Sequence, residues 1–186
     1  MSDHSVEEGL PGWALVDPAR LAHVRRVVAL VTDWADRMAV DPSERGRWLR
    51  AAWLHDALRD APVDELCRLA PGEGGPVELL HGPAAAARAA QDGEEDLGVL
   101  DAVRYHSVGW AGWDMPGVAL YCADFLEPGR RFEPEARAVL ARRFPAAPRD
   151  VLRDVAQWRL QWLIRSGWAI PEATWQFWNG LFGRRP

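Results

Sequence analysis

Apolar residues recur at steps of three and four along most of the chain, which is the spacing of one face of an α-helix. The first such run, from Pro18 to about Met38, has its apolar positions at Leu21, Val24, Val27, Val28, Val31 and Trp34. His23 shares their inward side, because it lies four residues before Val27 and eight before Val31. No alternation of apolar and polar residues long enough for a convincing strand occurs in the sequence. The pattern therefore predicts an all-α fold.

Turn and capping residues divide the chain into about eight or nine helices of ordinary length. Asp41-Pro42-Ser43 is a turn with an N-cap residue, and it predicts a second helix from Glu44 to about Arg59. Gly82-Pro83 predicts a break near the front of a later helix, because proline restricts the residue before it. The remaining helices are expected over residues 62–70, 77–90, 94–105 and 117–128, with three more between 134 and 182.

Composition places the chain among ordinary globular proteins, with 48% apolar and 26% charged residues over 186 positions. This length suits one domain with a substantial core. The formal charge of −5 argues against a nucleic-acid surface, which needs a basic face to neutralise phosphates, but small anionic ligands remain compatible with it. All 22 basic residues are arginines, and guanidinium groups suit bidentate contacts with phosphate.

Neither a secretion signal nor a membrane span is expected from the sequence. The first residues, MSDHSVEEGL, are acidic and polar, unlike a signal or transit peptide, and no apolar stretch reaches the roughly 18 residues of a membrane span. Cys67 and Cys122 stand in apolar helical contexts and are expected to be buried free thiols. We therefore expect a cytoplasmic protein.

Four of the five histidines stand at or near the apolar faces of separate predicted helices: His23, His55, His81 and His106. One such histidine is more often a hydrogen-bonded core residue than a ligand. Burying several imidazoles and carboxylates, however, costs several kcal/mol each unless they are paired or bound to a cation. The set therefore favours a divalent metal. Nitrogen and oxygen donors together suit iron, zinc, manganese and cobalt, whereas calcium and magnesium prefer oxygen alone.

His55 and Asp56 are adjacent in AAWLHDALRDA. Because neighbouring side chains on a helix point about 100° apart, His55 can bind one ion while the two oxygens of Asp56 reach between two. The pair is thus interpreted as a bridging device.

The order of these residues resembles the HD-domain metal-dependent phosphohydrolase superfamily in its version with two metal ions. Within it, HDALRDA, LLHGPAAAARA, VRYHSVGW, YCADFLEPGRRF and IPEATWQFWNGL are similar to the YqeK group of symmetrical bis(5'-nucleosyl)-tetraphosphatases. The likeness runs from about residue 18 to about residue 182. It implies an HD-domain helical bundle, with residues 1–17 as an N-terminal extension and residues 18–186 as a single domain that includes the tryptophan-rich C-terminal helices.

The resemblance also implies a set of metal ligands and a reaction. One metal would be held by His23, His55, Asp56 and Asp124, and the other by Asp56, His81 and His106. Asp56 would bridge the two ions and so take part in catalysis. Two iron ions are expected, with manganese, cobalt or zinc as alternatives. The implied reaction splits diadenosine tetraphosphate into two ADP by attack of a metal-bridging hydroxide.

Three further residues are candidate substrate contacts. Arg59, three residues after Asp56, could meet a phosphate and assist catalysis, and Arg130 in EPGRRF is a second phosphate contact. Trp110 follows the ligand His106 and could stack on a purine. The alternatives are a surface ion pair for Arg59, an ion pair with the nearby glutamate for Arg130, and core packing for Trp110.

Other functions use the same residues. A nucleotide phosphatase or phosphodiesterase of the wider superfamily would need the same six ligands, and some relatives of this architecture use two iron ions to activate dioxygen. A non-catalytic nucleotide sensor with a structural metal is a third alternative. The expected partner is a small nucleotide, without nucleic acid or membrane. The many C-terminal tryptophans suit a subunit contact, so a homodimer is also considered.

Overall fold

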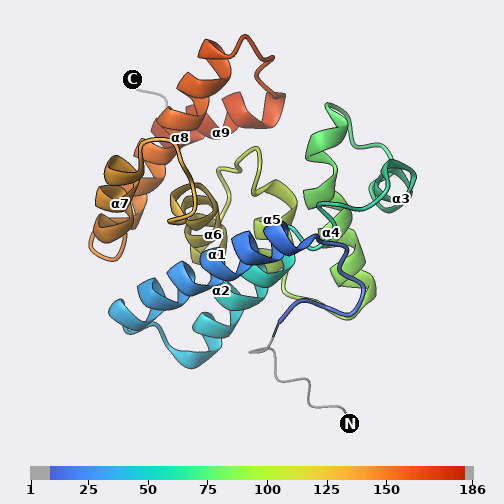
Figure 1. Ribbon diagram of the computed structural model, residues 1–186, viewed down its shortest axis with the longest axis horizontal. Helices are drawn as coiled ribbons and strands as arrows, with labels where there is room; N and C mark the ends of the chain where they lie inside the picture. Colours follow the sequence, from blue (N-terminus) through green and yellow to red (C-terminus); the bar gives the residue numbers. More distant parts are fainter. Residues whose placement is uncertain (1–8, 183–186) are drawn as a thin grey trace.

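The computed structural model of the protein describes residues 9–182, and this part of the chain contains nine α-helices, one 3-10 helix and no strand (Figure 1). The predicted all-α fold is therefore confirmed. Residues 1–8, which belong to the expected N-terminal extension, lie outside the described part. In chain order the helices are α1 (Pro18–Arg37), α2 (Pro42–Leu54), α3 (Val63–Leu69), η1 (Val77–Leu79), α4 (His81–Gln91), α5 (Leu97–Tyr105), α6 (Met115–Leu126), α7 (Pro134–Arg143), α8 (Pro148–Arg165) and α9 (Glu172–Phe182).

Aspartate caps explain where three of these helices begin. The side chain of Asp17 accepts a hydrogen bond from the backbone N–H of Arg20 at the start of α1, and Asp96 accepts one from Val99 at the start of α5. Asp41 likewise accepts from two backbone N–H groups in the first turn of α2. These bonds satisfy backbone donors that a helix leaves unpaired at its N-terminus.

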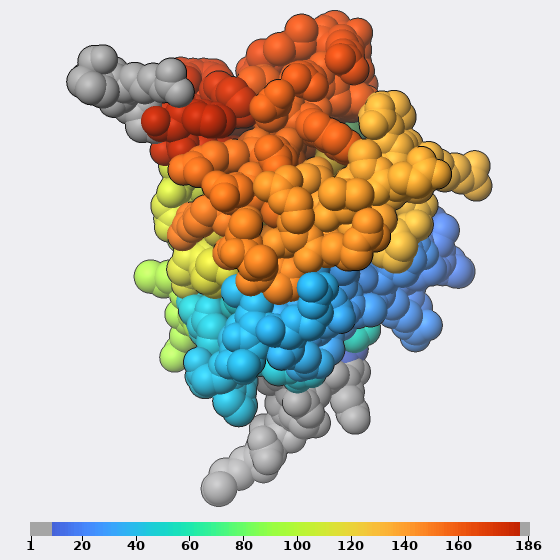
Figure 2. Space-filling view, turned by 90° about the vertical axis from the view of Figure 1, so that its left-hand side faces the viewer, coloured from blue at the N-terminus to red at the C-terminus, as the bar shows by residue number. Residues whose placement is uncertain are grey.

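Helix α6 is the centre of the core. Ten of its residues are buried, and α1, α2, α5, α7 and α8 all pack against it (Figure 1). A helix that is apolar on all sides belongs in an interior. Figure 2 shows α7 and α8 (orange) lying above α1 and α2 (blue) on one face of the molecule. Trp34 of α1 joins these layers, because it stacks on Phe144 at 3.8 Å and donates to the carbonyl of Ala141.

A smaller apolar cluster lies between the turn after α2 and helices α3, α4 and α5. The segment before α1 contacts this region. The Leu15 N–H donates to the carbonyl of Ala57 at 2.7 Å, and the Asp60 N–H donates to the carbonyl of Leu15 at 3.2 Å. Trp13 packs against the cluster and donates its indole N–H to Asp92. Residues 9–17 therefore hold the turn after α2 in place.

Two helix boundaries differ from the prediction. Helix α2 ends at Leu54 rather than near Arg59, because residues 55–60 form turns and the carbonyl of Ala57 pairs with Leu15 from outside the helix. The helix break expected at Gly82-Pro83 is found two residues earlier, at Leu80, because η1 ends at Leu79 and α4 begins at His81.

Both cysteines are free, but only one is buried. Cys122 lies in the core on α6, whereas Cys67 on α3 is exposed, so the prediction of a buried thiol is wrong for Cys67. The reason is that Leu66 and Leu69 occupy the buried side of that short helix. Among residues 9–182, no helix combines the length and the apolar character needed to cross a membrane.

Candidate metal centre

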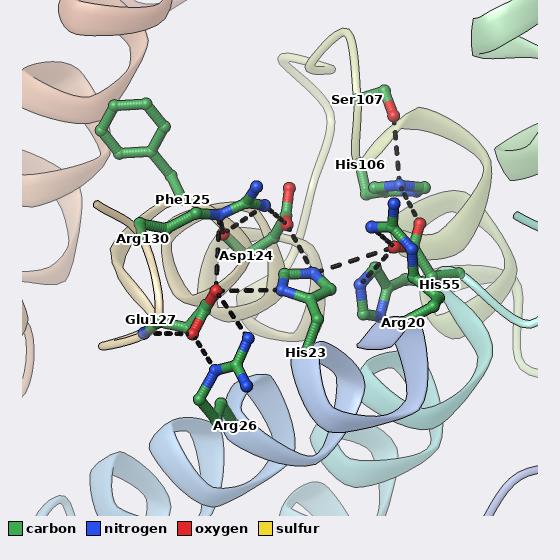
Figure 3. Close-up of polar contacts among 12 residues, drawn as sticks. Arg20, His23, Arg26, His55, His106, Ser107, Asp124, Phe125, Glu127 and Arg130 are labelled. Carbon is green, nitrogen blue, oxygen red and sulfur yellow. Dashed lines mark hydrogen bonds and ion pairs between the residues drawn. The ribbon is translucent and has the colours of Figure 1, made fainter. Parts of the chain in front are cut away.

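The six predicted ligands come from five different segments and converge in the interior. They are contributed by α1, the turn after α2, the first residue of α4, the end of α5 and the last part of α6. Figure 3 shows four of them: His23, His55, His106 and Asp124. All of them are buried, with between 0% and 8% of each residue exposed: His23, His55, Asp56, His81, His106 and Asp124. The six residues predicted as ligands therefore lie together in space.

Asp56 stands at the middle of the cluster, and its two oxygens face different histidines. Oδ1 lies 3.2 Å from Nε2 of His81 and 3.5 Å from Nε2 of His106. Oδ2 lies 3.6 Å from Nε2 of His55 and 3.8 Å from Nε2 of His23. The cluster therefore contains two groups with geometry suited to a metal ion, and they share Asp56.

Asp124 adjoins the first of these groups. Its Oδ1 lies 3.1 Å from Nε2 of His23, so a carboxylate from α6 faces the imidazole from α1 (Figure 3). Because α6 is the most buried helix of the core, this carboxylate has a fixed position near the helix end.

Hydrogen bonds at Nδ1 orient all four imidazoles with Nε2 toward the cluster. The Nδ1 atoms of His55, His81 and His106 lie 2.7, 2.8 and 2.7 Å from backbone carbonyls three residues earlier. Nδ1 of His23 lies 3.1 Å from the Glu127 carboxylate. In metal sites this arrangement fixes the tautomer and leaves the other nitrogen as the ligand atom. Consistent with this, the Nε2 atom of His55 is buried without a hydrogen-bond partner. The residues therefore fit a metal ion.

The electrostatics of the cluster favour ligand-competent protonation states. Burial lowers the pKa of His55 to about 4, and burial also lowers the pKa of His81 despite its hydrogen bond with Asp56. Burial alone would raise the pKa of Asp56, but His55, His106 and His81 outweigh it and hold the pKa well below the usual range. Neutral imidazoles and an ionised carboxylate are the forms that bind metal ions.

His23 behaves differently from the other imidazoles. Burial lowers its pKa, but the hydrogen bonds with Asp124 and Glu127 outweigh burial and raise the pKa above the usual value. A cation near this imidazole would therefore take the place of a proton.

Three arginines place positive charge against the two aspartates. Arg20 donates from Nη1 to Oδ2 of Asp56 at 2.8 Å. Arg130 and Arg159 each donate from Nη2 to one oxygen of Asp124, both at 2.7 Å. Arg130 also lies 3.6 Å from a Glu127 oxygen, so the ion pair considered as its alternative role is present as well.

Sequence reasoning missed Arg20 and Arg159. Arg20 lies three residues before His23 on α1, and this helical spacing was a usable signal. Arg159 comes from α8 and had no local signal.

A pocket of about 390 Å³ opens onto this cluster. Arg59 and Arg130 line it, as the sequence analysis expected of substrate contacts, together with Ser107 and the indoles of Trp162 and Trp168. The hydroxyl of Ser107, the residue that directly follows His106, lies 3.1 Å from Nε2 of His106.

Trp110 lies apart from this pocket in the described part of the chain. Its ring stacks on Tyr105 at 5.4 Å, and it does not line the pocket. Its role as a base contact stays a prediction.

Comparison with known proteins agrees with this description. The family model for the HD domain matches residues 20–141. The symmetrical bis(5'-nucleosyl)-tetraphosphatase of Bacillus subtilis is 30% identical over 121 residues, which is 61% of this chain and 63% of that protein. The alignment thus spans less than two thirds of this relative.

A crystal structure described as a predicted HD superfamily hydrolase involved in NAD metabolism, from Clostridium acetobutylicum, has the same fold. Its TM-score is 0.79 at 22% identity, over 91% of this chain and 92% of that one. The resemblance to the HD-domain family that was stated from the sequence is confirmed. Because the matching family model covers well over half of its residues, the chain belongs to the HD domain family.

Proposed function

We propose that the protein is a metal-dependent phosphohydrolase that cleaves a phosphoanhydride bond of dinucleoside polyphosphates, converting diadenosine tetraphosphate into two ADP. The observation that carries this proposal is the position of Asp56, whose two oxygens face two separate pairs of histidines. The similarity to the tetraphosphatase of Bacillus subtilis supports the choice of substrate.

The proposed metal ligands are the residues expected from the sequence. His23, His55, Asp56 and Asp124 would hold one ion, and Asp56, His81 and His106 the other. Iron is the proposed metal, with manganese, cobalt or zinc as alternatives that suit the same donors. When bound, the ions supply Lewis-acid stabilisation and a water molecule of lowered pKa.

The arginines around the pocket would bind and orient the polyphosphate. Arg20, Arg59 and Arg130 line the pocket, and Arg159 donates to Asp124 from behind it. Charge that develops on phosphate oxygens during phosphoryl transfer is stabilised by cations already in position. Arg59 is half-buried and donates a long hydrogen bond of 3.4 Å to the Glu78 carbonyl, so its guanidinium can turn toward phosphate.

Ser107 suggests a competing mechanism. Its hydroxyl lies close to two imidazoles, at 3.1 Å from His106 and 3.4 Å from His81, so it could attack phosphorus in place of water. The proposal assigns these imidazoles to metal and the hydroxyl to a phosphate contact. Ser107→Ala should then keep at least a tenth of the wild-type kcat, whereas loss of a nucleophile typically costs far more.

Product analysis tests the proposed function. The purified protein would be incubated with diadenosine tetraphosphate and either iron or manganese, with and without oxygen, and the products separated by chromatography. Two ADP per substrate, formed without oxygen, supports the proposal. AMP plus ATP, or no turnover, contradicts it, and oxygen-dependent turnover indicates a di-iron oxygenase instead. Asp56→Asn should be inactive, while Asp150→Asn on the exposed side of α8 is the matched control.

The remaining expectations are proposals of the same kind. We infer that residues 18–182 belong to one HD-type domain, since α8 packs on α6 and carries Arg159 to Asp124. Residues 183–186 of the expected domain lie outside the described part of the chain. A cytoplasmic location and a homodimer are proposed from the sequence alone.

A further inference from the structure

A second cavity lies next to the pocket of the metal centre. It has a volume of about 390 Å³ and is bounded by Phe125, Phe132, Trp158 and Trp162, and we call it the α8 cavity. Trp162 lines both this cavity and the pocket that contains Asp56, so the two spaces meet at one indole. Phe125 directly follows Asp124 in the sequence, which places the floor of the α8 cavity beside a proposed ligand.

The aromatic side chains of the α8 cavity are unusually accessible. Trp162 is 56% exposed and Phe132 is 60% exposed, although large apolar side chains normally bury such area. Phe125 and Trp158 pack edge to face behind them, with ring centroids 6.0 Å apart. Exposed rings over an aromatic floor suit a flat aromatic ligand, because nucleobases stack on such surfaces whatever their sequence.

The wall of the α8 cavity is built rigidly. Arg137 is 7% exposed and lies over the Phe125 ring at 3.9 Å. It donates from Nε to the carbonyl of Phe132 at 2.6 Å and from Nη1 to the carbonyl of Phe125. A buried guanidinium therefore ties the loop after α6 to the end of that helix. A cavity with a fixed wall and a volume above 300 Å³ is in the range of small-molecule sites.

Polar groups at the rim match the remainder of a nucleoside. Gln161 offers an amide that can both donate to and accept from a base edge, and Arg165 adds positive charge on the same helix. A purely apolar partner surface would leave this amide and this guanidinium unpaired. Glu133 also lines the α8 cavity, so its polar groups include an acid, an amide and a guanidinium. The lining therefore favours a small ligand with a flat ring and polar edges.

The geometry points to the α8 cavity as the binding site for one nucleoside of a dinucleoside polyphosphate, with its base stacked on Trp162. This inference rests on the proposed function. In such a substrate the phosphates lie between two nucleosides, so a nucleoside site must adjoin the metal centre rather than overlap it. The α8 cavity has this relation to Asp56, and Trp110, on the loop after α5, does not line it.

Substitution of Trp162 tests the inference without threatening the fold, because the side chain is more than half exposed. Trp162→Ala should raise the KM for diadenosine tetraphosphate about tenfold, as expected for loss of one stacked base. Trp162→Phe should restore most of the affinity, since it keeps an aromatic face. Trp175→Ala, at a position on α9 that is 48% exposed, is the matched control and should match wild type.

A binding measurement separates this inference from the proposed function. Titration calorimetry with a methylene-bridged diadenosine tetraphosphate analogue needs no turnover, and Trp162→Ala should weaken its Kd about tenfold. A Trp162→Ala protein within twofold of wild type in both KM and Kd overturns the α8 cavity as a nucleoside site while the proposed function stands. If wild type does not cleave diadenosine tetraphosphate, the proposed function fails, and the calorimetric comparison alone decides the cavity. Absence of analogue binding to wild type also overturns the inference.

Discussion

Glu127 supports the metal centre through His23, and replacing it by glutamine should weaken both the fold and the site. The carboxylate is 2% exposed and lies at the end of α6, where one oxygen faces Nδ1 of His23 at 3.1 Å (Figure 3). The other oxygen accepts from Nε of Arg26 at 2.5 Å and from the N–H of Gly129 at 2.6 Å. All of these partners are donors. Glutamine keeps the shape but has one oxygen, so its NH₂ group must face donors on one side.

The loss of stability depends on which donors to Glu127 can find another acceptor. A buried donor left without an acceptor costs about 1–3 kcal/mol, and breaking a fully buried ion pair costs about 3–5 kcal/mol. Arg26 is 37% exposed and can turn to water, whereas the N–H of Gly129 is fixed by the backbone. We therefore expect a loss of about 2–3 kcal/mol for Glu127→Gln. For a chain of this size that corresponds to a fall in Tm of roughly 4–12 °C.

Urea unfolding of the chelator-treated protein measures this stability difference. The same two proteins would then be titrated with Mn²⁺, because loss of a group that orients a ligand typically lowers metal affinity about 10- to 100-fold. Glu135→Gln is the matched control, since this glutamate is exposed on α7. If Glu127→Gln unfolds within about 0.5 kcal/mol of wild type and binds Mn²⁺ equally well, Glu127 neither stabilises the fold nor orients His23.

Three further predictions concern other parts of the molecule. Arg47 lowers the pKa of Asp96 to about 2 through hydrogen bonds, so this aspartate stabilises the fold above its usual pKa and loses that contribution as the pH falls toward 2. Asp96→Asn keeps the helix cap and should lower the free energy of unfolding in urea by about 2 kcal/mol at pH 7, but by almost nothing near pH 2. An equal loss at both pH values would contradict the pairing of Asp96 with Arg47. Gly109 has a φ of +91°, and a Cβ there would collide with Phe177, so Gly109→Ala should lower stability by about 2–4 kcal/mol, whereas an unchanged Tm would refute this packing. Ser107→Ala should retain kcat within about tenfold, and complete loss would favour a serine nucleophile.

Much of the metal centre could be predicted because its residues interrupt apolar helical faces. His23 lies in register with Val27 and Val31, and all three are buried. The adjacent His55 and Asp56 place an imidazole and a carboxylate within an alanine-rich run. Such polar residues are costly to bury, so their position in the sequence indicates a binding role.

Other features depend on contacts that spacing along the chain does not reveal. The prediction that α2 continues to Arg59 was wrong. The carbonyl of Ala57 accepts a hydrogen bond from the N–H of Leu15, more than forty residues away in sequence, and not from a residue of the same helix. Arg159 and Trp162 reach the site only because α8 crosses α6 near its end, and their own helix is rich in arginine and tryptophan. Nothing local distinguished these two residues from their neighbours.

The central claim is that Asp56 joins two metal sites, and the number of ions bound by matched variants tests it most directly. Chelator-treated protein would be titrated with Mn²⁺ and the bound metal counted by elemental analysis. The account predicts about two ions per chain for wild type, about one for His55→Ala or His81→Ala, and almost none for Asp56→Ala. A wild-type protein that binds no ion, or an Asp56→Ala protein that still binds two, would contradict it.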